Sequence, residues 1–219
     1  MLVANLPFES LPQIKLSDKV YHVLQLLYQY HVLELPVVDA GKFIGIIKEE
    51  TLHSADNEET IKELQSQLLK VSVNITDHLL KAVSFAVASR LSILPVTDAE
   101  NKLAGVVESL HLLDSLADFL QVSEPGAIIV LEIDALQYSF SEICRIVETN
   151  DAQITQLNTS KDKETGSMQL TIKINKMEIS DIVATFQRFE YHVKYYFGEE
   201  LYANELKKNY ENLMSYLNI

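Results

Sequence analysis

The sequence predicts an α+β protein in which a duplicated unit precedes a second, differently organised domain. Two observations support this prediction. Residues 14–39 align with residues 73–98 at a constant offset of 59 residues. The last third of the chain has another order of strand and helix patterns, with apolar and polar residues alternating strictly over residues 168–174. A chain of 219 residues is long enough for one large domain or two small ones.

Each copy of the repeat begins with a short apolar strand and continues with an amphipathic helix. Apolar side chains within residues 20–27 and 79–86 share the i, i+3, i+4, i+7 spacing of a helix with one buried face. Ser17 and Thr76 precede these segments, and their hydroxyls are suited to accept hydrogen bonds from a first helical turn. We therefore expect a capped helix in both copies.

Both copies then show the pattern of two short strands joined by a turn. The sequence L-P-V-[VT]-D-A is followed by K-x-x-G-[IV]-[IV] at residues 35–47 and 94–107. Gly45 and Gly105 occupy the same place in this pattern. Glycine inside a strand weakens pairing, so its presence twice indicates that another backbone or a ligand approaches closely. Residues 61–68 continue the first copy with a helical pattern.

The order strand, helix, strand, strand, helix and the recurring motif resemble a tandem pair of cystathionine-β-synthase (CBS) domains. The resemblance covers roughly residues 1–122, and we expect residues 1–68 to form the first repeat and 69–122 the second. Neither copy alone covers its sheet, so the two are expected to pack against each other.

The remainder, residues 123–219, predicts a strand-helix-strand-strand-helix-strand unit, which is the ferredoxin-like order. Its first helix begins with a capping-box sequence, Ser139 to Glu142, and a polar loop is expected at residues 158–167. Attached to CBS repeats, such a unit resembles the ACT domain of acetoin-utilisation-type CBS–ACT proteins. A C-terminal helix from about Ala203 is expected to pack on its own domain or to form a dimer contact.

The CBS resemblance implies an adenosine-type ligand, such as an adenine nucleotide or S-adenosylmethionine, in a cleft between the repeats. The family motif is G-x-[IV]-[ST]-x-x-D, whose hydroxyl binds phosphate and whose carboxylate binds ribose. The matching candidate residues here are Gly45, Lys48 and Thr51 in the first copy and Gly105, Glu108 and His111 in the second. Both copies lack the hydroxyl and the Asp, so only Lys48 brings a positive charge to a phosphate.

The ACT resemblance implies a second candidate site, where the first strand of that domain meets its helix. The family motif there is D-x-P-G-[LV]-L, in which glycine lets the backbone approach an amino acid. This chain keeps the acid as Asp134 but lacks Pro-Gly, and bulky Tyr138 stands near that place. These two residues are the candidates, and the departures weaken the expectation of amino-acid sensing.

Composition and spacing argue against several other classes of function. The formal net charge of −13 disfavours binding to nucleic acid or to a membrane surface. Cys144 is the only cysteine, and the six histidines lack zinc-site spacing, so no metal site is predicted. No catalytic motif and no secretory signal is visible, which favours a non-enzymatic, cytoplasmic protein that requires no cofactor.

Two functions fit these observations. The first is a non-catalytic regulatory or sensory module, in which a ligand between the repeats changes the activity of a protein partner. The second is a ligand-free dimerisation or scaffold protein with degenerate CBS and ACT sites. A homodimer is expected in either case, because open sheet edges and flat helical faces favour pairing with a second copy.

Overall fold

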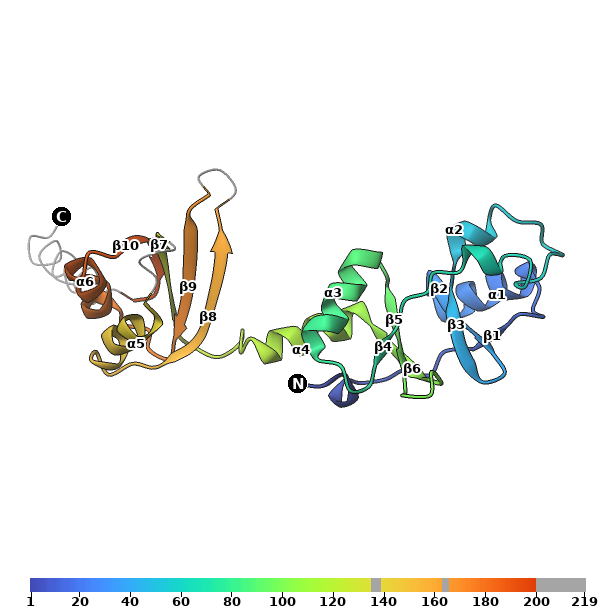
Figure 1. The fold of residues 1–219 in the computed structure, drawn as a ribbon, viewed down its shortest axis with the longest axis horizontal. Helices are drawn as coiled ribbons and strands as arrows, with labels where there is room; N and C mark the ends of the chain where they lie inside the picture. The colour runs from blue at the N-terminus through green and yellow to red at the C-terminus, as the bar shows by residue number, and fades with distance from the viewer. Residues whose placement is uncertain (135–138, 163–165, 200–219) are drawn as a thin grey trace, which may run out of the picture. The chain divides into compact units, whose positions relative to one another are not determined.

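A computed structural model describes residues 1–134, 139–162 and 166–199. The chain divides into two compact units, Met1–Leu120 and Gln121–Ile219. Each unit is described by itself (Figure 1). The C-terminal helix expected from Ala203 lies outside the described residues.

The first unit contains two sheets of three strands and four α-helices. Its elements are the 3₁₀ helix η1 (Val3–Asn5), β1 (Ile14–Lys15), α1 (Val20–Tyr30), β2 (Glu34–Asp39), β3 (Lys42–Lys48), α2 (Glu49–Leu52), η2 (Gln65–Gln67), β4 (Val73–Asn74), α3 (Leu79–Ser89), β5 (Ile93–Thr97), β6 (Leu103–Glu108) and α4 (Ser109–Phe119).

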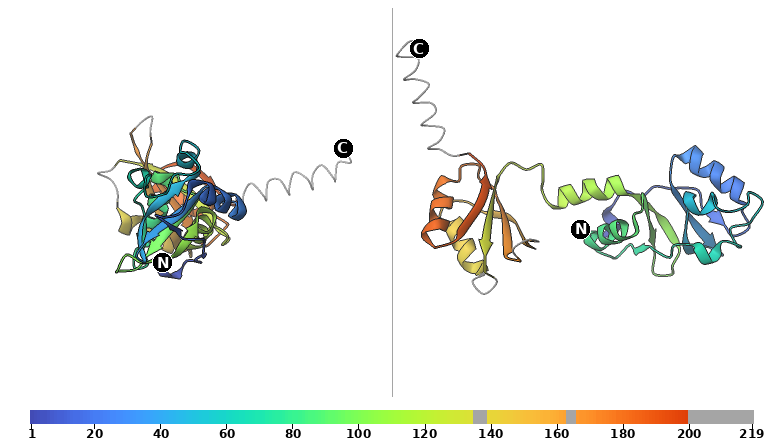
Figure 2. Two further views of the ribbon diagram at one scale, coloured as in Figure 1. Left: turned by 90° about the vertical axis from the view of Figure 1, so that its right-hand side faces the viewer. Right: turned by 90° about the horizontal axis from the view of Figure 1, so that it is seen from above.

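The predicted duplication is present in the strand pairing. The sheets have the orders β1-β2-β3 and β4-β5-β6, each with one parallel and one antiparallel pair. Val37 pairs with Gly45, Val96 pairs with Gly105, and each sheet has an irregularity directly after this pair. Both sheets lie between α1 and the helices α3 and α4 (Figures 1 and 2).

The segment that precedes β1 packs into the second repeat, and the segment that precedes β4 packs into the first, so the repeats exchange the segments that lead into them. In the N-terminal segment (residues 1–9), Val3 and Leu6 are buried in the core of the second repeat, beside Leu79. In the linking segment (residues 61–69), Leu64 and Leu68 are buried in the core of the first repeat. Each core therefore contains apolar residues from a segment that lies outside its own strand-helix-strand-strand pattern.

Two local predictions in this unit are wrong. The helices begin at Val20 and Leu79, so the N-cap residues are Lys19 and His78 rather than Ser17 and Thr76. The neighbouring Asp18 instead closes a turn, because its carboxylate accepts a hydrogen bond from Lys15 N at 2.8 Å. The helix predicted at residues 61–68 is absent, and turns and η2 replace it. The apolar spacing there reflects burial of an irregular segment.

The second unit has the ferredoxin-like fold. Its sheet has the antiparallel order β10-β7-β9-β8, and α5 and α6 cover one face of it (Figures 1 and 2). The elements in chain order are β7 (Ala127–Ile133), α5 (Phe140–Glu148), β8 (Ile154–Lys161), β9 (Met168–Ile174), α6 (Ser180–Arg188) and β10 (His192–Phe197). This order confirms the predicted βαββαβ fold.

Two details of this unit differ from the sequence-based expectation. Ser139 is the N-cap of α5, but its side chain makes no capping hydrogen bond. Glu142 instead accepts a hydrogen bond from the Tyr191 hydroxyl at 2.8 Å, which ties α5 to the residue before β10. The predicted polar loop is shorter than expected, since β8 continues to Lys161. Within the described residues, none of the helices has the length and apolar character needed to cross a membrane.

The close approach expected at the two glycines is present, and it comes from the exchanged segments. A Cβ atom added at Gly45 would lie 2.8 Å from Leu68 Cβ, and one at Gly105 would lie 3.1 Å from Phe8 Cβ. Directly beside the glycines, Ile46 bridges to Leu69 and Val106 bridges to Glu9, both antiparallel. The two glycines thus occupy equivalent settings in the two repeats.

We predict that Gly45→Val destabilises the protein by roughly 1–3 kcal/mol, because the new side chain overpacks the contact with Leu68. Gly105→Val is expected to have a smaller effect in the same direction, since its neighbour is farther away. Urea unfolding measures both. The matched control is Ala104→Val on the exposed side of β6, expected to change stability by less than about 0.5 kcal/mol. Equal stability of Gly45→Val and Ala104→Val would contradict this packing.

Candidate functional site

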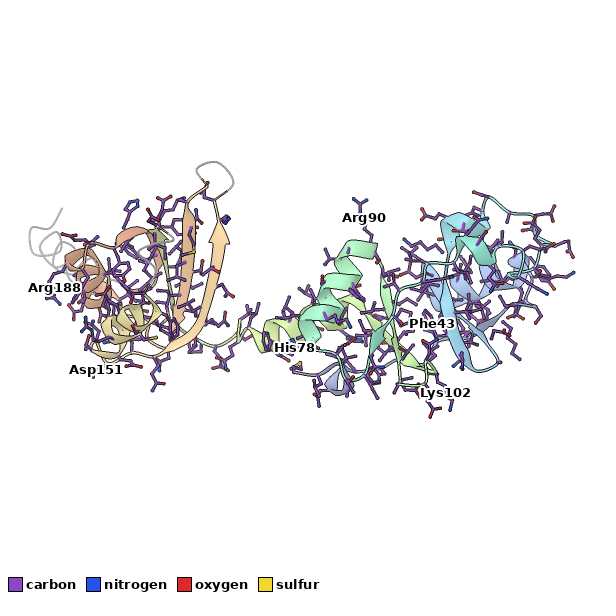
Figure 3. The ribbon with its side chains drawn as sticks, in the orientation of Figure 1. Phe43, His78, Arg90, Lys102, Asp151 and Arg188 are labelled. Carbon is purple, nitrogen blue, oxygen red and sulfur yellow. The ribbon has the colours of Figure 1, made fainter. Side chains whose placement is uncertain are left out.

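The two repeats are joined at the ends of their hairpins. The Phe43 N–H donates to the Asn101 carbonyl at 2.9 Å, and the Asn101 side-chain amide donates back to the Phe43 carbonyl at 2.9 Å. Phe43 lies between the two sheets, and its side chain is buried in the core of the second repeat (Figure 3). The boundary between the repeats is therefore a packed, hydrogen-bonded interface.

Lys48 ends β3 and directly precedes α2, at the boundary with the second repeat. Its side chain is 26% exposed. The ammonium group lies 3.4 Å from the carbonyl oxygen of Ser89, the last residue of α3, and 3.9 Å from Glu50. A cation at a helix C-terminus is favoured by the helix dipole. Both contacts are long, so the charge is only weakly neutralised.

Glu34 is a buried acid that the sequence analysis did not single out. It pairs with Lys48 across the β2–β3 ladder, yet its carboxylate reaches into the second repeat. Only 3% of Glu34 is exposed. The same oxygen accepts hydrogen bonds from Ser92 N, from Ser92 Oγ at 2.8 Å and from Ile93 N at 2.9 Å. The sequence signal that could have identified Glu34 is its position immediately before L-P-V, where the second copy has the apolar residue Ile93.

The remaining candidates of the first repeat contribute less to a ligand site. Thr51 lies in α2 and is partly exposed. Gly45 faces the linking segment, and Gly105 faces the N-terminal segment, so the chain itself fills the space beside both glycines. The structure thus brings Lys48 to the boundary between the repeats but does not open the backbone at either glycine to a ligand.

The second repeat places an acidic group where the first has Lys48. Glu108 ends β6 and directly precedes α4, and His111 lies in the first turn of that helix. Glu9 approaches both of them from the N-terminal segment. Burial raises the pKa of the Glu9 carboxyl, the nearby Glu108 carboxylate raises it further, and His111 partly offsets the increase. This side of the second repeat is therefore unfavourable for a phosphate.

Asp134 directly follows β7 in the second unit and lines a cavity of about 520 Å³ with Glu132, Lys161 and Ser167, among others. A hydrogen bond from the Ser167 hydroxyl holds the pKa of Glu132 below its usual value, with smaller contributions from Lys194 and His192. Tyr138, the other candidate there, lies outside the described residues.

An apolar groove of about 450 Å³ lies between α3 and α4. Its lining includes Val87, which is 72% exposed, and Leu113, which is 60% exposed. Arg90 is the only charged residue among those that line it. The sequence patterns predicted the buried face of α3 but not this exposed apolar surface.

Comparisons with known proteins agree with this architecture. Residues 3–58 match the CBS domain family. A CBS domain pair/ACT domain protein from Thermotoga maritima is similar in structure, with 25% identity, coverage of 55% of this chain and 99% of the other, and a TM-score of 0.50. The chain thus contains a CBS domain, within a first unit whose fold resembles a CBS domain pair, and its second unit has a ferredoxin-type fold.

Two further relatives are more distant. An uncharacterised protein of Methanocaldococcus jannaschii is 24% identical over 155 residues, and the match covers 69% of this chain. The chain spans only 57% of that relative's length. A solved CBS domain pair in complex with 5′-methylthioadenosine and S-adenosyl-L-methionine is 20% identical, covers 54% of this chain and 98% of the other, and has a TM-score of 0.46.

We predict that Glu34→Ala destabilises the first unit by roughly 1–3 kcal/mol, because it leaves the buried N–H groups of Ser92 and Ile93 without their acceptor. Chemical unfolding measures the change. The control is Glu50→Ala, whose carboxylate is 80% exposed and makes only a long contact with Lys48. A double-mutant cycle of Glu34→Ala with Ser92→Ala is expected to show coupling, and strict additivity would count against the network.

Proposed function

We propose that this protein is a non-catalytic, cytoplasmic regulatory module that binds an adenosine-type ligand beside Lys48. The observation that carries the proposal is the opposite charge at two equivalent positions. Lys48 and Glu108 both end the last strand of their repeat and precede its second helix. Only the first repeat offers a cation at this position to the phosphate or carboxylate of such a ligand, whereas the second repeat has the acid Glu108 there, close to Glu9.

The position of Lys48 also suits a regulatory mechanism. Its ammonium group belongs to the first repeat but contacts the last carbonyl of α3 in the second repeat. An anion that binds Lys48 competes with this contact and thereby changes the interaction between the repeats. A ligand shifts a conformational equilibrium only by its difference in affinity for the two states, so this contact is the link that we expect a ligand to use.

We expect AMP, ATP or S-adenosylmethionine to raise the midpoint of thermal unfolding. Binding to the native state alone contributes about 2.7 kcal/mol at a hundredfold excess over Kd. Lys48→Ala should remove most of the shift, and Thr51→Ala should reduce it less. Lys102→Ala is the control, because Lys102 is an exposed lysine away from this position. A Lys48→Ala variant that binds these compounds as tightly as the native protein does would contradict the proposal.

The second candidate function is a ligand-free scaffold. The Glu34 network favours it, because a buried carboxylate already joins the two repeats directly through Ser92 and Ile93. A negative charge at this boundary also disfavours a phosphate near it. An unchanged midpoint with every compound of the panel supports the scaffold over the sensor.

For either function we propose a homodimer formed through the groove between α3 and α4. The exposed side chains there are apolar except Arg90, and a chain with a net charge of −13 can approach its copy most easily across a surface that carries no acidic residue. Burying several such side chains at about 25 cal/mol per Å² favours association.

Sedimentation equilibrium at micromolar concentration should give about twice the mass of one chain, which is 24.8 kDa. Leu113→Glu is expected to shift the distribution to the monomer, because it places a charge in the apolar contact. Val122→Glu is the matched control, since Val122 is similarly exposed but lies outside the groove. A monomeric native protein, or equal dissociation in both variants, is the result that rejects this interface.

A further inference from the structure

Three side chains from two separate stretches of the chain meet beside the hairpin of the second repeat. Glu9 lies on the N-terminal segment, Glu108 ends β6, and His111 lies in the first turn of α4. One possible ligand atom from each residue lies within 4.8 Å of the other two. Within residues 1–134, 139–162 and 166–199, this is the one such group of three histidine, cysteine or acidic residues.

The backbone holds the three residues in place independently of their side chains. Glu9 N donates to the Val106 carbonyl at 2.8 Å, and Val106 N donates to the Glu9 carbonyl at 3.0 Å. The contact of Phe8 with Gly105 fixes the same segment from the adjacent residue. Glu108 and His111 are three residues apart at the start of a helix, so their side chains project from the same turn. The arrangement is therefore preorganised.

The cluster has an excess of negative charge and a histidine nitrogen without a hydrogen-bond partner. Two carboxylates lie close together, and within the cluster only His111 can supply a positive charge. The Nδ1 atom of His111 is buried and has no hydrogen-bond partner. It lies 3.6 Å from Glu9 Oε1, which is too long for a hydrogen bond. A cation between these atoms would satisfy the imidazole nitrogen and relieve the repulsion between the acids.

The separation of the donor atoms fits a shared ion. Two ligands that are each about 2.0–2.1 Å from a tetrahedral zinc ion lie about 3.3 Å apart. The 3.6 Å between His111 Nδ1 and Glu9 Oε1 is close to this value, and a carboxylate oxygen of Glu108 lies within 4.8 Å of a possible ligand atom of each of the other two residues. The side chains of His111 and Glu9 are 34% and 37% exposed, so the cluster lies at the surface, although the Nδ1 atom of His111 is itself covered.

We propose that Glu9, Glu108 and His111 bind one divalent transition-metal ion, with zinc as the best match. An imidazole nitrogen with two carboxylates suits zinc and its neighbours better than magnesium or calcium, which prefer all-oxygen sites. Three protein ligands leave a coordination position for water or a small anion. The ion joins the N-terminal segment to α4, and the site is separate from the ligand position beside Lys48.

The test is a calorimetric titration of the full chain with ZnCl₂ after removal of metals with EDTA. The native protein is expected to bind one ion per chain, and more tightly than it binds MgCl₂. His111→Ala and Glu9→Gln should each weaken zinc binding by at least about 10–100-fold, since that is the cost of losing even indirect support of a ligand. His53→Ala is the matched control, because His53 lies 3.3 Å from Glu49 without a third donor.

Circular dichroism establishes whether each variant is folded, and the nearly isosteric Glu9→Gln tests the site if His111→Ala does not fold. Cobalt(II) supplies a second readout, because loss of the imidazole ligand changes its visible absorption. Absence of zinc binding by the native protein overturns the proposal. Equal binding by the native protein and by both site variants also overturns it, since the acidic surface then holds an adventitious ion only.

Discussion

The fold of the first unit depends on two extended segments that cross two glycines. The linking segment passes Gly45 in the first repeat, and the N-terminal segment passes Gly105 in the second. A side chain at Gly45 would occupy space that the linking segment needs, and one at Gly105 would crowd the N-terminal segment. Because each crossing also carries apolar residues into a core, the two repeats are stabilised together rather than as separate domains. The equivalent crossings give the unit its approximate symmetry.

The electrostatics do not follow this symmetry. At the ends of the equivalent strands, Lys48 faces the carbonyl end of α3, while Glu108 lies beside Glu9 and His111. A buried acid, Glu34, connects the repeats at a place where the second copy has Ile93. The two repeats therefore share one backbone arrangement, but the residue that ends the last strand is a base, Lys48, in the first and an acid, Glu108, in the second. Our two proposals follow from this difference, with a phosphate beside Lys48 and a cation beside Glu108.

Much of the fold was predictable because it depends on local periodicity. The repeat at offset 59 indicated both CBS domains, and the alternation at residues 168–174 indicated the central strand of the ferredoxin-like sheet. The helical spacing at residues 61–68 was misleading, because burial of an irregular segment produces the same pattern. Ser17 and Thr76 were wrong as caps, since the adjacent Asp residues form turns that delay the helices.

The candidate sites were predictable only in part, because they depend on residues that are distant in sequence. Lys48 was identified from its place in a family motif, and the structure sets it at the boundary between the repeats. The approach of Glu9 to His111 follows from the crossing of the N-terminal segment, which carries no repeat signal of its own. Glu34 was missed because its partners, Ser92 and Ile93, lie 58 and 59 residues away.

The exchange of segments has a consequence for synthesis of the chain. Residues 3–9 leave the ribosome before their partners Ile75, Asp77 and Val106, which emerge only after most of the unit has been translated. Contacts of such large sequence separation form slowly, because the entropy of closing a long loop is lost before the contacts form. Until then, the apolar side chains of Val3 and Leu6 have no core to enter. The nascent first repeat therefore carries an uncovered apolar segment, which is buried only when the second repeat folds.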